Sequence, residues 1–263
     1  MSELFVVVRP EQFFYCLSVL AVAGFVQGTF GLGFAMIATP LLALTLDYRG
    51  AVFLAAVPLL FLAVSYLIVQ WRQIISERLS KGIAPGLILG SFLGVWVQTS
   101  LPQYAALGLL AILLAASAAL PTIVEHSLTM QRTFAKTPPI AFGTLAGLTD
   151  TALNVGAPMI VLYGGINKLS RLQQLLALNL CFAIGKTIQI SLTATAMLPP
   201  VTVAYLGWGI VASLVAYVAG TRLAGRFSED GFRRALNLFL YLMACVIGYR
   251  AIAQAIHLNF AVR

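Results

Sequence analysis

The chain has 263 residues, of which 60% are hydrophobic and only 9% are charged. A soluble domain usually carries about a quarter charged residues, so this composition excludes a soluble globular protein. The formal net charge of +8 does not indicate a nucleic-acid partner, because the basic residues lie in short turns between apolar runs. We therefore predict an all-α polytopic membrane protein with the lipid bilayer as its solvent.

In chain order, ten apolar segments predict ten membrane-associated helices. Six of them are close to the roughly 20 residues that span the hydrocarbon; they are 51–70, 83–100, 104–121, 173–197, 201–220 and 235–257. The other four form two pairs, 11–27 with 31–46 and 139–149 with 152–164. Each pair flanks a stretch rich in glycine and proline, so we expect short or interrupted helices there.

Lysine and arginine gather in four turns, which the positive-inside rule places in the cytoplasm; they are 71–82, 122–138, 164–172 and 221–234. The uncharged turns 101–103 and 198–200 should face outward. Segments 51–70 and 173–197 then run in opposite directions, each after a short pair and before two more spans. This predicts two inverted-topology repeats of about five helical segments, 1–121 and 139–263, joined by a cytoplasmic connecting loop, 122–138.

The first short pair contains the sequence Gln27-Gly-Thr-Phe-Gly-Leu-Gly33, with Thr39-Pro40 beyond it. Its glycines permit either a broken helix that lines a cavity or close helix approach. The stretch lacks the Gly-Lys-Ser/Thr ending of a phosphate loop. The candidate binding residues are Gln27, Gly28, Thr29, Gly31 and Gly33. The alternative is that the stretch only packs helices tightly.

The second short pair contains Gly147-Leu-Thr-Asp-Thr-Ala-Leu-Asn-Val-Gly156. A helix over 139–149 is about 16 Å long and would reach only the bilayer midplane. Asp150 would then lie deep in the membrane, where an acidic residue is costly and indicates function. Free N–H groups at the helix ends there would suit an anion. The candidates are Thr149, Asp150, Asn154 and Gly156; the alternative is that Asp150 caps the next helix.

A third set of polar residues follows one face of segment 173–197, because the spacings between them are seven, three and four; they are Asn179, Lys186, Gln189 and Thr193. Lys186 is near the middle of the span and needs a partner, which is Asp150, a bound anion or both in alternation. A lysine–acid pair that an anion or a proton disrupts would couple the two. The alternative is a purely structural ion pair.

Other polar and small residues carry further predictions. We expect Asp47 and Arg49 to form a solvated turn and Arg250 to snorkel to its helix end. The ridge Gly86, Gly90 and Gly94 predicts helix packing. The cysteines lack CxxC spacing and the histidines are isolated, so we predict no metal site and no cofactor.

Several motifs follow one another along the chain, namely Gly24-Phe-Val-Gln-Gly-Thr-Phe-Gly-Leu-Gly-Phe34, Thr39-Pro40-Leu-Leu, Pro85 to Gly94, Gly143 to Gly147 and Val155-Gly-Ala-Pro158. In these motifs and their order the chain resembles the TauE/SafE sulfite exporter family over nearly its whole length. The family's second repeat often has a glycine-rich turn where this chain has Thr149 to Asn154. The resemblance implies transport of sulfite, organosulfonates or related sulfur-containing or carboxylate anions across the bacterial cytoplasmic (inner) membrane.

Our prediction is therefore a secondary transporter that works by alternating access, coupled to protons through Asp150. A passive anion channel and an intramembrane enzyme are the alternatives, although the sequence offers no nucleophile–base pair for an enzyme. The sequence leaves open the direction of transport, the stoichiometry and whether the protein forms a homo-oligomer.

Overall fold

The computed structural model describes residues 10–76, 80–197 and 200–261, and regular structure in these residues is entirely helical. Ten helices correspond to the ten predicted segments; they are α1 (Pro10–Phe30), α2 (Phe34–Leu42), α3 (Tyr48–Val69), α5 (Ser80–Ser100), α6 (Gln103–His126), α8 (Pro139–Leu153), α9 (Ala157–Ile166), α10 (Arg171–Met197), α11 (Pro200–Leu223) and α12 (Glu229–Ala261). The prediction of an all-α membrane protein is confirmed.

Three further helices lie in stretches predicted as basic turns; they are α4 (Trp71–Ser76), α7 (Leu128–Lys136) and the 3₁₀ helix η1 (Ala224–Arg226). The predicted connecting loop 122–138 thus holds the end of α6 and all of α7. Residues 77–79 and 198–199, which belong to turns used in the prediction of topology, lie outside the described residues.

Among the described residues, seven helices are long and apolar enough to cross a membrane, one more than the six predicted. The additional span is α1, which continues through Gly28 to Phe30 instead of ending at Gln27. Gly28 does not break the helix. It allows α1 to pack closely against α11, where a Cβ at this position would lie 2.9 Å from the backbone carbonyl carbon of Tyr217. The break comes at Gly31 and Gly33, whose φ angles are 80° and 110°.

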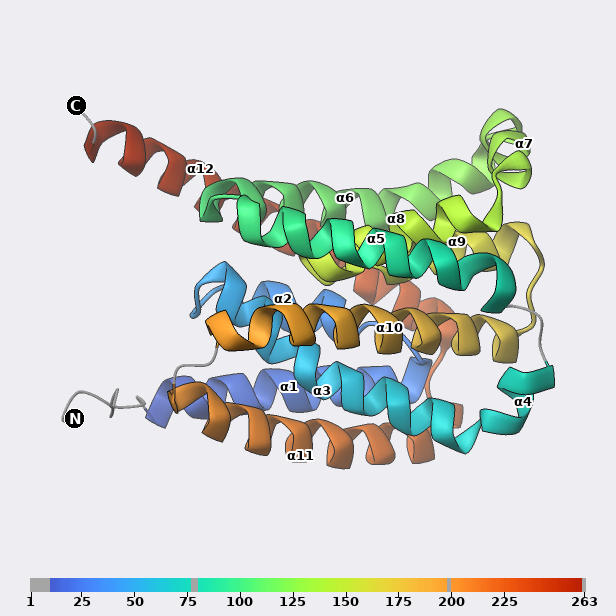
Figure 1. The fold of residues 1–263 in the computed structure, drawn as a ribbon, viewed down its shortest axis with the longest axis horizontal. Helices are drawn as coiled ribbons and strands as arrows, with labels where there is room; N and C mark the ends of the chain where they lie inside the picture. Colours follow the sequence, from blue (N-terminus) through green and yellow to red (C-terminus); the bar gives the residue numbers. More distant parts are fainter. Residues whose placement is uncertain (1–9, 77–79, 198–199, 262–263) are drawn as a thin grey trace.

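The helices pack mainly as neighbouring pairs, in which α5 lies along α8, α1 along α11, α6 along α12 and α3 along α10. Figure 1 shows α5, α6 and α8 on one side of the molecule, α1, α3 and α11 on the other, and α10 between them. Glycines allow the closest approaches. A Cβ at Gly90 would lie 2.8 Å from the backbone nitrogen of Leu148, which confirms the predicted packing role of the ridge on α5.

The outer faces of the bundle carry large apolar side chains, as a protein surrounded by lipid requires. Ile112, Val215 and Tyr249 are 68%, 66% and 75% exposed. Arg250, which we predicted to snorkel, has a partner within the protein: its guanidinium donates a hydrogen bond to the carbonyl of Ala43, just after α2. This bond ties α12 to the end of a short helix.

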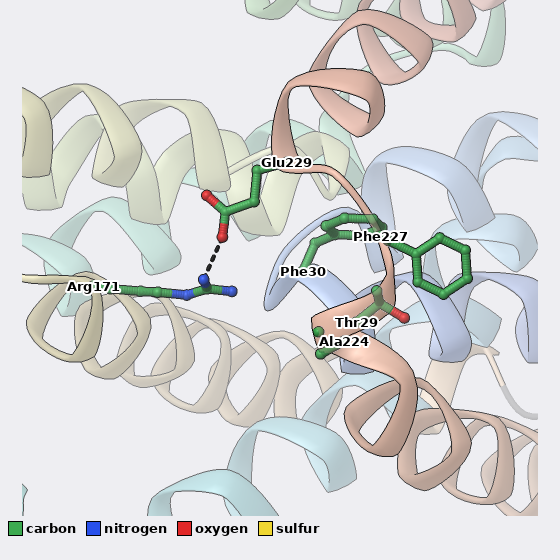
Figure 2. A pocket seen from close by; sticks show the side chains of 7 residues that line it. Thr29, Phe30, Arg171, Ala224, Phe227 and Glu229 are labelled. Carbon is green, nitrogen blue, oxygen red and sulfur yellow. Dashed lines mark hydrogen bonds and ion pairs between the residues drawn. The ribbon is translucent and has the colours of Figure 1, made fainter.

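The 47–50 turn is also more than a solvated turn. Asp47 caps α3 by accepting a hydrogen bond of 3.0 Å from the Gly50 amide. Arg49 donates to the carbonyl of Thr99 over 2.7 Å and so connects the start of α3 to the end of α5. At the opposite end of α3, the ends of α1, α10 and α12 and the short helix η1 line an open pocket of about 230 Å³ (Figure 2).

Candidate functional site

The second interrupted helix places Asp150 at the centre of the protein. Asn154 has φ 58° and ψ 29°, so α8 ends there, one turn beyond the predicted end at residue 149. The amides of Asn154 and Val155 donate to the carbonyls of Asp150 and Thr149 over 3.0 and 3.1 Å, which closes the helix. Asp150 therefore lies in the last turn of α8, and it does not cap α9, because the N-cap residue Gly156 has no side-chain cap.

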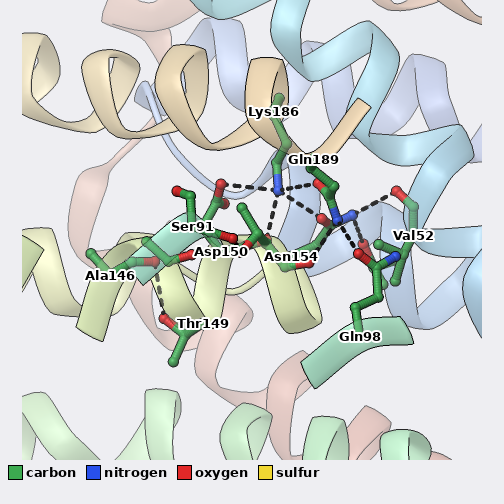
Figure 3. Close-up of polar contacts among 12 residues, drawn as sticks. Val52, Ser91, Gln98, Ala146, Thr149, Asp150, Asn154, Lys186 and Gln189 are labelled. Carbon is green, nitrogen blue, oxygen red and sulfur yellow. Dashed lines mark hydrogen bonds and ion pairs between the residues drawn. The ribbon is translucent and has the colours of Figure 1, made fainter. Parts of the chain in front are cut away.

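Lys186 and Asp150 form a fully buried ion pair in which Nζ lies 3.0 Å from Oδ2 and both side chains are 0% exposed (Figure 3). The ammonium group also donates hydrogen bonds to the carbonyl oxygen of Asp150 over 2.7 Å and to Asn154 Oδ1 over 2.7 Å. A fourth oxygen, Gln189 Oε1, lies 3.2 Å away. A buried charge is costly unless it is paired and hydrogen-bonded, and Lys186 meets both conditions.

The two amide side chains that face Lys186 are fixed by partners of their own. Gln189 Nε2 donates to the carbonyl of Thr151 over 2.7 Å and to Gln98 Oε1 over 3.0 Å. Asn154 Nδ2 donates to Thr39 Oγ1 and to the Val52 carbonyl, each over 3.0 Å. Since the NH₂ groups are used elsewhere, both amide oxygens have to face the ammonium. The network therefore gives Lys186 a rigid shell of oxygen atoms.

The Asp150 carboxylate is held differently. Within the described residues neither of its oxygens accepts a hydrogen bond, so the attraction to Lys186 is that of an ion pair. Two glycines make room for it: a Cβ at Gly185 would lie 2.5 Å from Oδ2, and one at Gly156 would lie 2.5 Å from the Asp150 Cβ. Gly156 also sets the start of α9 beside this residue, and a helix N-terminus favours negative charge. Of the groups whose oxygens face the Lys186 ammonium, the Asp150 carboxylate is thus the one that carries a charge, and a proton can remove that charge.

The break between α1 and α2 contacts a different part of α10 from the part that carries Lys186. Gln27 bridges its break, because Nε2 donates to the Gly31 carbonyl over 3.1 Å and Oε1 accepts from the Phe34 amide over 3.2 Å. A Cβ at Gly31 would overlap the side chain of Leu175. Leu175 precedes Lys186 by eleven residues, which is about 16 Å of helix. The two breaks therefore contact α10 at separate levels, so the candidate residues of the two short pairs do not form one site.

The structure brings together only part of the predicted site, namely Asp150, Asn154, Gly156, Lys186 and Gln189. Thr149 points away from Lys186 and donates to the Leu145 carbonyl of its own helix over 2.8 Å (Figure 3). Asn179 is buried and donates to the Leu175 carbonyl over 2.8 Å. Thr29 donates to the Phe25 carbonyl over 2.8 Å and lines the pocket of Figure 2. The remaining glycines, Gly28, Gly31 and Gly33, shape or pack α1.

Sequence reasoning missed three residues around the ion pair. Gln98 is buried and accepts a hydrogen bond from the Gln189 side chain. Ser91 is buried, and its carbonyl accepts a 3.0 Å hydrogen bond from the Thr151 hydroxyl. Tyr48 donates its hydroxyl proton to the Ala152 carbonyl. Ser91, Gly94 and Gln98 have spacings of three and four, so one polar face of α5 was readable although it was interpreted as packing alone.

A comparison with known families decides the class of the protein. Residues 16–247 match the family described as sulfite exporter TauE/SafE. The chain belongs to the TauE/SafE sulfite exporter family. As a member it is a multi-pass membrane transporter and not an enzyme, and the match covers both interrupted helices and the whole ion-pair network. No curated protein and no solved structure matches the chain.

Proposed function

We propose that this TauE/SafE protein moves small anions, with sulfite and organosulfonates first among them, across the bacterial cytoplasmic membrane by alternating access coupled to protons. The observation that carries the proposal is the buried ammonium of Lys186, whose one charged partner among the described residues is Asp150. A cation that is enclosed in a transporter and balanced by a single carboxylate is suited to exchange that carboxylate for an anionic substrate.

The coupling follows from charge balance. An anion that reaches Lys186 has to displace one of its oxygens, and displacing the carboxylate would leave two negative charges beside one positive charge. If Asp150 takes up a proton, the pair gains one positive charge, which a monovalent anion then neutralises. Proton and anion therefore bind to the same conformation, and together with the pair they form a neutral cluster that costs little to carry across the low-dielectric interior.

The helix packing supports two halves related by inversion. When the helices of 1–121 are exchanged in order for those of 139–263, α1 corresponds to α8, α3 to α10, α5 to α11 and α6 to α12. The α5–α8 pair then becomes the α11–α1 pair, and α3–α10 and α6–α12 each become themselves. Such internal symmetry is the usual basis of alternating access in secondary transporters.

The test is uptake into proteoliposomes with a panel of sulfite, sulfoacetate, taurine, acetate and sulfate, each with and without a pH gradient. We expect saturable uptake of sulfite or a sulfonate that is stimulated when the anion side is acidic. Lys186→Ala should abolish this flux and Asp150→Asn should remove its pH stimulation. Arg132→Gln on α7 is the control, because Arg132 is exposed and lies outside α8 and α10, the helices that form the ion pair.

Transport by both variants at the parental rate would show that the ion pair is not the site. A flux that rises linearly with concentration and shows no counterflow would indicate a channel instead of a carrier.

A further inference from the structure

A second charged site lies at the start of α10, in the pocket of Figure 2. Arg171 and Glu229, the first residues of α10 and α12, form an ion pair there, and their side chains are 64% and 67% exposed. Phe30 forms part of the wall and stacks on Phe232 with 3.7 Å between ring centroids. Gly225 of η1 also lines the pocket, and a Cβ there would meet nothing within 4 Å. The pocket thus combines one guanidinium with an aromatic wall.

The pair at the pocket repeats the arrangement at the centre of the protein. In both places α10 supplies the cation, Arg171 or Lys186, and a different helix supplies the carboxylate. The two cations are fifteen residues apart, which is about 22 Å along the helix. The buried side chain of Asn179 lies on α10 between them. The same helix therefore presents a cation at its basic end and another in the interior.

We infer that this pocket is a second anion-binding site, in which Arg171 binds a small oxyanion of the sulfite or sulfonate class in place of Glu229. The inference rests on the proposed function for its role, which is to receive the anion on the basic side before it moves to Lys186. A guanidinium binds planar or tetrahedral oxyanions through two parallel hydrogen bonds. A volume of about 230 Å³ is below the range of sites for drug-sized ligands and suits a small anion.

The difference in burial explains why exchange begins here. An exposed ion pair contributes little to stability, so an arriving anion displaces Glu229 at small cost. The buried Lys186–Asp150 pair resists the same exchange, because a lone buried charge is costly. The stretch 221–234, which contributes four of the lining residues, carries four arginines against two acidic residues in its sequence, and this net positive charge attracts anions.

Chemical labelling tests the site without requiring transport. In a background in which the exposed Cys245 is replaced by serine, Gly225→Cys places a thiol in the pocket, and Gly165→Cys places one near the same end of the bundle. A Cβ meets nothing within 4 Å at either position, so both variants should fold. The thiols are reacted with methanethiosulfonates that carry either a sulfonate or a trimethylammonium group.

We expect the sulfonate reagent to react several-fold faster than the cationic reagent at residue 225 but not at residue 165. Methanesulfonate should protect the thiol at 225 in a saturable way, whereas chloride at the same ionic strength should not. Arg171→Gln should abolish this protection, and Glu229→Gln should achieve it at a several-fold lower concentration.

Equal protection at both thiols, or protection that survives Arg171→Gln, would overturn the inference. Specific protection in a protein that transports none of the anions would leave the pocket standing and contradict the proposed function instead.

Discussion

Asn154 Nδ2 donates a 3.0 Å hydrogen bond to Thr39 Oγ1, so the break between α8 and α9 is tied to α2 in the other half of the protein. The Oδ1 atom of the same side chain accepts a 2.7 Å hydrogen bond from the Lys186 ammonium. Its backbone has a φ of 58°, a conformation that asparagine tolerates better than most residues. One residue therefore shapes the break, orients the cation and links the two halves.

Replacing Asn154 separates these contributions. Both Asn154→Gly and Asn154→Ala remove the side-chain hydrogen bonds, but only alanine is strained in the left-handed conformation. We expect alanine to be less stable than glycine by about 1–2 kcal/mol, the cost of that backbone region for a residue with a Cβ. Thermal unfolding in detergent measures the difference. Equal midpoints for the two variants would mean that the conformation at 154 is not a constraint.

The second prediction concerns the glycines that allow α5 and α8 to pack closely. Gly90→Ala should lower stability by about 1–3 kcal/mol, the usual cost of overpacking a tight contact. The control is Gly207→Ala on α11, where a Cβ meets nothing within 4 Å. Alanine has the higher helix propensity by up to about 1 kcal/mol, so the control should be neutral or stabilising. A loss of stability at 207 equal to that at 90 would contradict the packing argument.

The buried ion pair predicts a non-additive stability cycle. Lys186→Met leaves the Asp150 carboxylate buried without its counter-ion and should destabilise the protein by about 3–5 kcal/mol. The double variant Lys186→Met/Asp150→Leu removes both charges and should recover most of that loss, because well-packed apolar residues can replace a buried pair. The measurement is again the unfolding midpoint. Additive losses in the double variant would show that the two charges do not stabilise each other in the folded protein.

Periodicity predicted the ten helices correctly, because apolar runs between turns report directly on burial in lipid and protein. It also placed Lys186 and Gln189 on one face of α10. What it could not predict is which helices meet. Gly28 and Gly31 are both glycines in one short motif, yet one packs against Tyr217 and the other against Leu175. Gln98 joins the site because α5 also contacts α10, where Gln189 donates a hydrogen bond to it, and no local pattern encodes which helices meet.

The last prediction concerns pH. A sulfonate stays ionised over the whole accessible range, so its uptake reports on protein groups alone. In the parent, a proton on Asp150 releases the charge of Lys186, and the affinity for the sulfonate should therefore rise as the anion side becomes more acidic. Asp150→Asn is neutral at every pH and has no carboxylate to displace. Its half-saturating concentration should resemble that of the parent at acidic pH and stay constant as the pH rises. A variant that keeps the parental pH profile would assign the coupling proton to another group, whereas a pH-independent parent would show that sulfonate transport is not coupled to protons.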